Sequence, residues 1–134
     1  MNVLVLCTGN RWRSPLYAEL LRRARPDWEV RSAGTHCSRP GADLPRAWRA
    51  CLPGWVDDHR AVKALDSDIS WADVVLGVQE SHRKYVHQSF PDKAVVMCRT
   101  IDPCFRPRAE WQALADAMVA RIPTIVTLLE RYHD

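Results

Sequence analysis

A cysteine and an arginine six positions apart stand in a short loop between an apolar run and a helix-like segment. Cys7 ends the run NVLVLC (2–7), and Arg13 directly precedes the segment SPLYAELLRRARP (14–26). A thiolate is a strong nucleophile, and a guanidinium offers a planar pair of donors that fits a phosphate-like oxyanion. The spacing therefore suggests an anion-binding loop built around a nucleophile.

The residues between and after this pair suit such a loop. Backbone N–H groups at a helix N-terminus bind anions, and the helix dipole favours negative charge, including that of a thiolate. Gly9 allows the backbone to curl around the anion, and Asn10 tolerates the left-handed conformation. Ser14 is expected to cap the helix, with Pro15 at its first position, and to donate its hydroxyl to the sulfur.

The Cys-x5-Arg spacing is weak evidence by itself. With five cysteines and 16 arginines in the chain, chance gives roughly even odds of one match. Only Cys7 makes this match, and it does so between a strand and a helix, where the chemistry requires it. The alternative interpretation is a buried cysteine beside a solvated arginine.

Short apolar runs alternate along the chain with segments of helical periodicity. Strands are expected at 2–7, 28–34, 73–78 and 94–98, and helices at 14–26, 42–54, 79–88 and 108–132. This alternation predicts an α/β domain with a parallel sheet, and ligands bind beyond the carboxyl ends of such strands. Pro123 is expected either to kink the last helix or to start a second segment. No repeat or linker interrupts the pattern, so residues 1–134 are expected to form one domain.

Composition narrows the class of protein. The chain has 134 residues, of which 47% are hydrophobic and 26% charged, as in an ordinary globular domain. The net charge of +3 comes without a basic run, which argues against nucleic-acid binding. No apolar stretch approaches the ~20 residues that span a bilayer, and the N-terminus lacks signal-peptide features, so a cytoplasmic location without membrane association is expected. The five cysteines form no C-x-x-C pair, which disfavours structural zinc and predicts reduced thiols.

Several segments resemble one known family. VLCTGNRWRSP (5–15) is similar to the signature loop of the low-molecular-weight protein tyrosine phosphatases. RSAGT (31–35), GADLPRA (41–47), DDHRAVKAL (57–65) and IDPCF (101–105) resemble later segments of that family, in the same order. The resemblance implies a flavodoxin-like four-stranded parallel sheet flanked by helices on both faces.

The resemblance and the loop chemistry together imply hydrolysis of a phosphomonoester, with a phosphotyrosine protein as the expected substrate and phosphate or a similar oxyanion in the loop. Cys7 would form a phosphocysteine, while Arg13 and the amides of residues 8–13 would bind the equatorial oxygens. Asp102 would act as general acid and base, although an Asp-Pro pair alone indicates only a turn. No metal or cofactor is needed, because arginine and amides supply the positive field. The other expected site residues are Thr8, Gly9, Asn10, Arg11, Trp12 and Ser14 in the loop, Ser32 and His59 in its support, and Arg11, Trp12, Cys104 and Phe105 on the substrate rim.

The sequence departs from the family pattern at three places. Trp12 stands where the family usually carries a second cysteine, so Cys7 lacks the neighbour for a protective disulfide. Arg11 replaces an apolar or small residue; unless it is only a solvated surface arginine, it should favour acidic or multiply charged substrates and repel a phosphoarginine guanidinium. Cys104 and Phe105 stand where the family places tyrosines, which weakens the aromatic wall for a phenyl ring.

Two alternative functions stay open. Arsenate reduction uses the same fold and loop but requires relay cysteines, and residues 79–93, where the reductases carry them, contain none. A non-catalytic phosphate-binding module is the second alternative. Such a module would not need Asp102.

Overall fold

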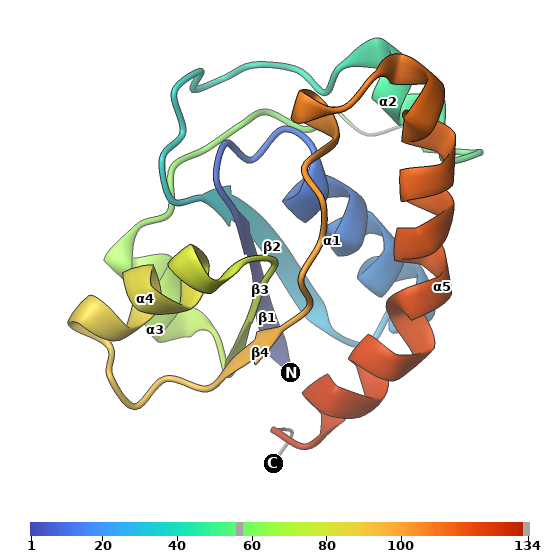
Figure 1. Ribbon diagram of the computed structural model, residues 1–134. Helices are drawn as coiled ribbons and strands as arrows, with labels where there is room; N and C mark the ends of the chain where they lie inside the picture. Colours follow the sequence, from blue (N-terminus) through green and yellow to red (C-terminus); the bar gives the residue numbers. More distant parts are fainter. Residues whose placement is uncertain (56–57, 133–134) are drawn as a thin grey trace.

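A four-stranded parallel sheet forms the centre of the computed structural model, which describes residues 1–55 and 58–132 (Figure 1). The strand order is β2-β1-β3-β4, so the predicted parallel sheet of four strands is confirmed. The strands are β1 (Asn2–Cys7), β2 (Glu29–Gly34), β3 (Val74–Gly77) and β4 (Val95–Met97). The helices are α1 (Arg13–Ala24), α2 (Arg46–Arg49), α3 (Asp66–Trp71), α4 (Glu80–Ser89) and α5 (Trp111–Glu130).

Helices cover both faces of this sheet. Side chains of β1 alternate between the faces, as in any strand. Val3 and Val5 join the apolar core that includes buried residues of α1 and α5, whereas Leu4 and Leu6 join the core that contains residues of α3 and α4 (Figure 1). Because β1 is central and buried on both faces, its carboxyl end is firmly placed, and Cys7 lies there.

The start of α1 differs from the prediction. The helix begins at Arg13, its N-cap residue is Trp12, and no side chain caps it. Ser14 therefore lies inside the first turn rather than at the N-cap. Its hydroxyl bonds to the sulfur of Cys7 instead, at 2.9 Å.

Two short helices also differ from the expectation. Of the helix predicted over 42–54, only Arg46–Arg49 is helical, because Pro45 bounds it and Pro53 and Gly54 follow soon after. Helix α3 was not predicted. Its six residues are too few to show helical periodicity, although two aspartates in its first turn are a typical start signal.

The predicted helix over 108–132 is confirmed over most of its length. Arg108–Glu110 forms a 3-10 turn, and α5 then continues to Glu130 as a single helix with Pro123 inside it. Pro123 is exposed, so the carbonyl group left without its helical partner is close to solvent. The second-segment alternative for Pro123 is thus excluded.

The segment that contains α5 is more apolar than expected from the sequence. The segment Arg108–Glu130 has the length and composition of a membrane-spanning helix, contrary to the expectation that no stretch approaches that length. One stripe of this helix packs into the core shared with α1. The buried residues of the stripe are Ala115, Met118, Ile122, Ile125 and Leu129.

Candidate active site

The loop after β1 packs closely against the end of β2. The N–H groups of Thr35 and His36 donate to the carbonyl oxygens of Cys7 and Thr8, each at 3.0 Å. A side-chain carbon on Gly34 would lie 2.6 Å from the Thr8 carbonyl oxygen, closer than such atoms approach. Only glycine therefore allows this approach of the two backbones. Gly34 was not predicted from the sequence to shape the loop.

The sulfur of Cys7 is buried and receives hydrogen bonds from the loop. The backbone N–H of Asn10 donates to it at 3.2 Å, and the hydroxyl oxygen of Ser14 lies 2.9 Å away. The side-chain amide of Asn10 donates to that same hydroxyl oxygen at 2.9 Å and holds Ser14 beside the sulfur. The Asn10 N–H and the Ser14 hydroxyl group thus converge on the sulfur of Cys7.

Asn10 is the structural centre of the loop. It is fully buried and has a φ of 57°, so it adopts the left-handed conformation expected for it. Its side-chain amide donates to the Ser32 hydroxyl at 3.0 Å, and its side-chain oxygen accepts from the Val62 N–H at 2.9 Å. His59 Nε2 donates to the Asn10 carbonyl at 2.7 Å. Both predicted support residues, Ser32 and His59, therefore contact Asn10.

Arg13 and Asp102 lie together although 89 positions separate them. The buried guanidinium of Arg13 donates through Nη1 to Gln79 Oε1 at 2.9 Å and to the Thr100 carbonyl at 3.1 Å. Its Nη2 lies 3.5 Å from Asp102 Oδ2. The other carboxylate oxygen of Asp102 accepts from the Cys104 N–H at 3.0 Å, which fixes the start of a 3-10 turn. The contact between Arg13 and Gln79 was not predicted from the sequence.

His82, on the first turn of α4, was also missed. Its Nδ1 accepts hydrogen bonds from the N–H groups of Val78 and Gln79, both at 3.2 Å, so the ring proton sits on Nε2 and is donated to Thr8 Oγ1 at 3.1 Å. Burial, and then the nearby charge of Arg13, lower the pKa of His82 to about 4. The imidazole is therefore neutral at pH 7.

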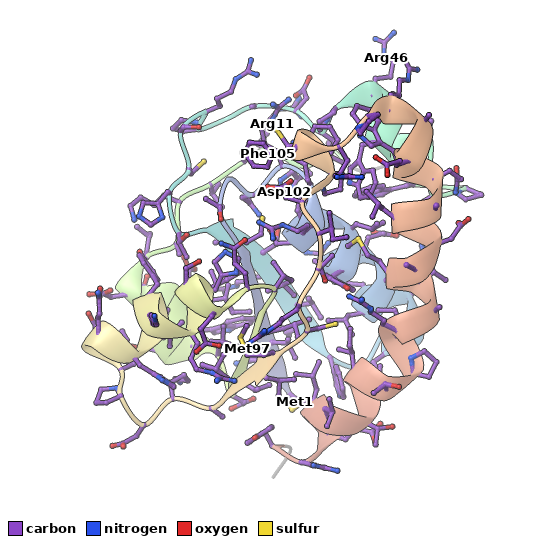
Figure 2. The ribbon with its side chains drawn as sticks, viewed as in Figure 1. Met1, Arg11, Arg46, Met97, Asp102 and Phe105 are labelled. Atoms are coloured by element: carbon purple, nitrogen blue, oxygen red, sulfur yellow. The ribbon has the colours of Figure 1, made fainter. Side chains whose placement is uncertain are left out.

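A hollow of about 600 Å³ opens over the loop and Asp102. Arg11 and Phe105 contribute to its rim, and Figure 2 shows both near Asp102, at the end of the molecule away from Met1. The Phe105 ring is 83% exposed. Gly9 also lines the hollow, and its φ is not in the left-handed region. A side-chain carbon on Gly9 would meet no atom within 4 Å.

Arg11 and Trp12, on the rim of the hollow, both contact residues outside the loop. The Arg11 guanidinium donates to the backbone carbonyl of Asp43 at 3.2 and 3.1 Å, a partner without charge. The Trp12 ring packs against Trp48 and Trp111, with ring centres 5.7 and 4.8 Å away. Its carbonyl accepts from the Trp48 indole at 2.9 Å. Trp12 thus connects the loop to α2 and α5 as well as lining the hollow.

Comparison with known protein families identifies the family of this chain. The family model described as low molecular weight phosphotyrosine protein phosphatase matches residues 2–110. The chain belongs to this family. The resemblance noted in the sequence is thereby confirmed, except that residue 57, the first of the segment 57–65, lies outside the described residues.

Relatives in the family carry two different activities in their names. A protein-arginine-phosphatase of Geobacillus stearothermophilus is 30% identical over 92 residues, covering 67% of this chain and 62% of the relative. A low molecular weight protein-tyrosine-phosphatase of Escherichia coli K12 is 32% identical over 93 residues, covering 68% and 63%. The chain thus matches less than two thirds of the length of these relatives.

Solved structures show the same fold over nearly the whole chain. The low molecular weight protein tyrosine phosphatase from T. tengcongensis has a TM-score of 0.83 at 25% identity, with 95% of this chain and 98% of that chain covered. The YwlE arginine phosphatase from Geobacillus stearothermophilus has a TM-score of 0.79 at 25% identity, with 99% and 97% covered. The flavodoxin-like fold expected from the sequence is confirmed.

Proposed function

We propose that this protein hydrolyses phosphomonoesters through a phosphocysteine intermediate. The observation that carries the proposal is the meeting of three groups at one end of the sheet: the hydrogen-bonded sulfur of Cys7, the guanidinium of Arg13, and the carboxyl group of Asp102 beside it. A nucleophile, an anion-binding cation and a proton carrier are the groups that phosphoryl transfer requires.

In the first step, the thiolate of Cys7 attacks phosphorus in line with the leaving oxygen. The S–P bond forms as the P–O bond to the leaving alcohol breaks, and protonated Asp102 gives its proton to that oxygen. Charge on the equatorial oxygens is stabilised by Arg13 and by backbone N–H groups of residues 8–13. These donors are held in place before substrate arrives.

In the second step, water replaces the thiolate at phosphorus. Asp102, now a carboxylate, takes a proton from the attacking water, the new P–O bond forms, and the S–P bond breaks to release phosphate and the Cys7 thiolate. Ser14, whose hydroxyl oxygen lies 2.9 Å from the sulfur, stabilises the thiolate as it leaves. The cycle returns Cys7 and Asp102 to their starting forms.

Phosphotyrosine in an acidic peptide is the substrate that the rim favours. Among the described residues that line the hollow, Arg11, Arg13 and Arg39 carry positive charge and Asp102 is the sole carboxylate. The Arg11 guanidinium donates to a carbonyl oxygen rather than to a carboxylate, so this contact does not offset its positive charge. A cationic phosphoarginine side chain is repelled at such a rim, whereas negatively charged residues flanking a phosphotyrosine are attracted.

Hydrolysis of para-nitrophenyl phosphate between pH 4.5 and 8 tests the activity. We expect a bell-shaped profile for the wild type, loss of turnover in Cys7→Ser, and a decrease of kcat by roughly 10²–10⁴-fold in Asp102→Ala. Wild-type protein that binds phosphate without any turnover would contradict the proposal. Arsenate-dependent oxidation of thioredoxin would then separate a reductase from a binding module.

The rim charge is tested with two phosphotyrosine peptides that differ only in acidic or neutral flanking residues. We expect kcat/KM to favour the acidic peptide, and Arg11→Ala to reduce that preference by about fivefold, the effect of one charge near the surface. The control is Arg131→Ala, an exposed arginine just beyond the C-terminal end of α5. Equal preferences in the wild type and in Arg11→Ala would show that Arg11 is only a solvated surface residue.

A further inference from the structure

The first turn of α4 contacts the phosphate-binding loop at both of its ends. His82 donates to Thr8, the first residue after the nucleophile, at 3.1 Å. Gln79 accepts from Arg13, the last residue of the motif, at 2.9 Å. A single rigid turn, anchored at the end of β3, thus spans the width of the loop.

The contact with Arg13 uses a neutral acceptor. The amide nitrogen of Gln79 donates to the Ser81 hydroxyl at 2.8 Å, which turns the amide oxygen toward the guanidinium. The second acceptor on the same Nη1 is the Thr100 carbonyl, also uncharged. Nη1 of Arg13 is therefore oriented by two neutral acceptors, and the carboxylate near this guanidinium is that of Asp102, 3.5 Å from Nη2. A carboxylate in place of the Gln79 amide would neutralise much of the positive charge of Arg13.

The contact with Thr8 is also made by a neutral group. Two backbone N–H groups donate to His82 Nδ1, which requires a lone pair on that nitrogen and leaves Nε2 as the donor to Thr8. Both ring nitrogens are thus occupied in one defined tautomer. The ring is fully buried, so its orientation is fixed.

We propose that Gln79 and His82 are positioning residues, which hold the two ends of the loop in the anion-binding geometry through neutral groups that add no negative charge beside Arg13. This inference rests on the proposed function, because it concerns the same loop. Binding of inorganic phosphate is the readout chosen for it, since phosphate binding does not require turnover. Failure of hydrolysis and failure of the positioning role are therefore distinguishable.

The electrostatic part is tested with Gln79→Glu and Gln79→Met. Calorimetry with inorganic phosphate and the pH dependence of Cys7 alkylation by iodoacetamide report the field of the loop. We expect Gln79→Glu to weaken phosphate binding about tenfold or more and to move the alkylation midpoint to higher pH, because the new carboxylate pairs with Arg13 and opposes the thiolate. Gln79→Met removes the acceptor without adding charge, so we expect weaker phosphate binding with little movement of the midpoint.

The matched control is Gln88→Glu, an exposed residue near the other end of α4 that receives the same change of charge. It should leave both measurements as in the wild type. If Gln79→Glu binds phosphate and reacts with iodoacetamide like the wild type, the electrostatic role of Gln79 is wrong.

The contact between His82 and Thr8 is tested with a double-mutant cycle. Thr8→Val removes the hydroxyl group with little change of shape, and His82→Phe keeps an aromatic ring but removes the donor to Thr8 and the acceptor of the Val78 and Gln79 N–H groups. We expect each variant to weaken phosphate binding about fivefold and the double variant to be no weaker than the poorer single one, because the two changes delete one shared interaction.

Thr8→Ser, which keeps the hydroxyl group, should bind phosphate far better than Thr8→Val. Should His82→Phe fail to fold, this comparison decides alone. Additive losses in the cycle, or equal binding by Thr8→Ser and Thr8→Val, would overturn the role of His82.

Discussion

The chemistry of Cys7 depends on the side chains within reach of its sulfur. The Asn10 N–H donates to it, and the Ser14 hydroxyl oxygen lies 2.9 Å away. The residue at position 12 is a tryptophan whose ring is packed against Trp48 and Trp111. The five cysteines all lie in the described ranges and all are free thiols. Cys7 therefore has no thiol at position 12 to trap an oxidised form.

Mild oxidation should therefore inactivate the protein with poor reversibility. Without a neighbouring thiol, the sulfenic acid formed at Cys7 proceeds to the sulfinic acid, which dithiothreitol does not reduce. Residual activity after peroxide and then dithiothreitol, with the mass of the Cys7 peptide, measures this. Full recovery in the wild type that is lost in Cys104→Ser or Cys37→Ser would instead show that one of those cysteines protects Cys7.

At the scale of secondary-structure elements, the ends of two neighbouring elements support the loop after β1. The end of β2 supports the loop after β1, and the first turn of α4 supports it from the β3 side. Both contacts lie at the carboxyl edge of the parallel sheet, where the strand order places β1 between β2 and β3. Loop geometry is therefore set by the two flanking strands as much as by the loop's own sequence.

Gly34→Ala should damage both activity and stability. The added carbon would lie 2.6 Å from the Thr8 carbonyl oxygen, so the loop backbone must shift. Overpacking of this kind costs about 1–3 kcal/mol of folding free energy. We expect phosphate affinity and kcat/KM to fall about tenfold or more, since misplacement of catalytic groups is costly. Urea unfolding and phosphate calorimetry measure the two effects; unchanged affinity would show that the loop tolerates the displacement.

At the scale of the whole molecule, the buried histidine links stability to pH. The pKa of His82 is lowered from 6.5 to about 4, so the folded protein resists protonation that the unfolded chain accepts. Its contribution is complete above pH 6.5 and decreases as the pH falls toward 4. The decrease is on the order of 3 kcal/mol.

Urea unfolding of the wild type and His82→Gln at pH 7, 5 and 4 tests this linkage. The difference in unfolding free energy between the two proteins should be largest at pH 7 and shrink toward pH 4. Glutamine is a suitable replacement because it does not titrate. A difference that stays constant from pH 7 to pH 4 would mean that His82 has the same pKa in the folded and unfolded states.

Much of the fold follows from local patterns in the chain. Apolar runs such as residues 2–7 and 94–98 predict buried strands, and their alternation with helices predicts the parallel sheet. The loop around Cys7 is likewise local, because nucleophile, turn residues and arginine are consecutive. Asp102 had to come from family resemblance, since nothing near it distinguishes a general acid from a turn residue.

The residues that support the loop are far from it in the sequence, and so they were not predicted. His82 reaches Thr8 across 74 positions, and Gln79 reaches Arg13 across 66. These contacts depend on the pairing register of β1 with β3, which composition and periodicity do not specify. The same holds for Gly34, whose requirement for glycine arises only when the Thr8 backbone packs against it.

The packing of Trp12 has an optical consequence. Its carbonyl belongs to the anion-binding loop, while its ring lies within 6 Å of two further indoles, centre to centre. An anion that binds in the loop changes the electric field at the Trp12 indole, which emits fluorescence and is packed against two other indoles. The protein thus carries a built-in fluorescent reporter, with which occupancy of the loop can be titrated in a variant such as Cys7→Ser that turns nothing over.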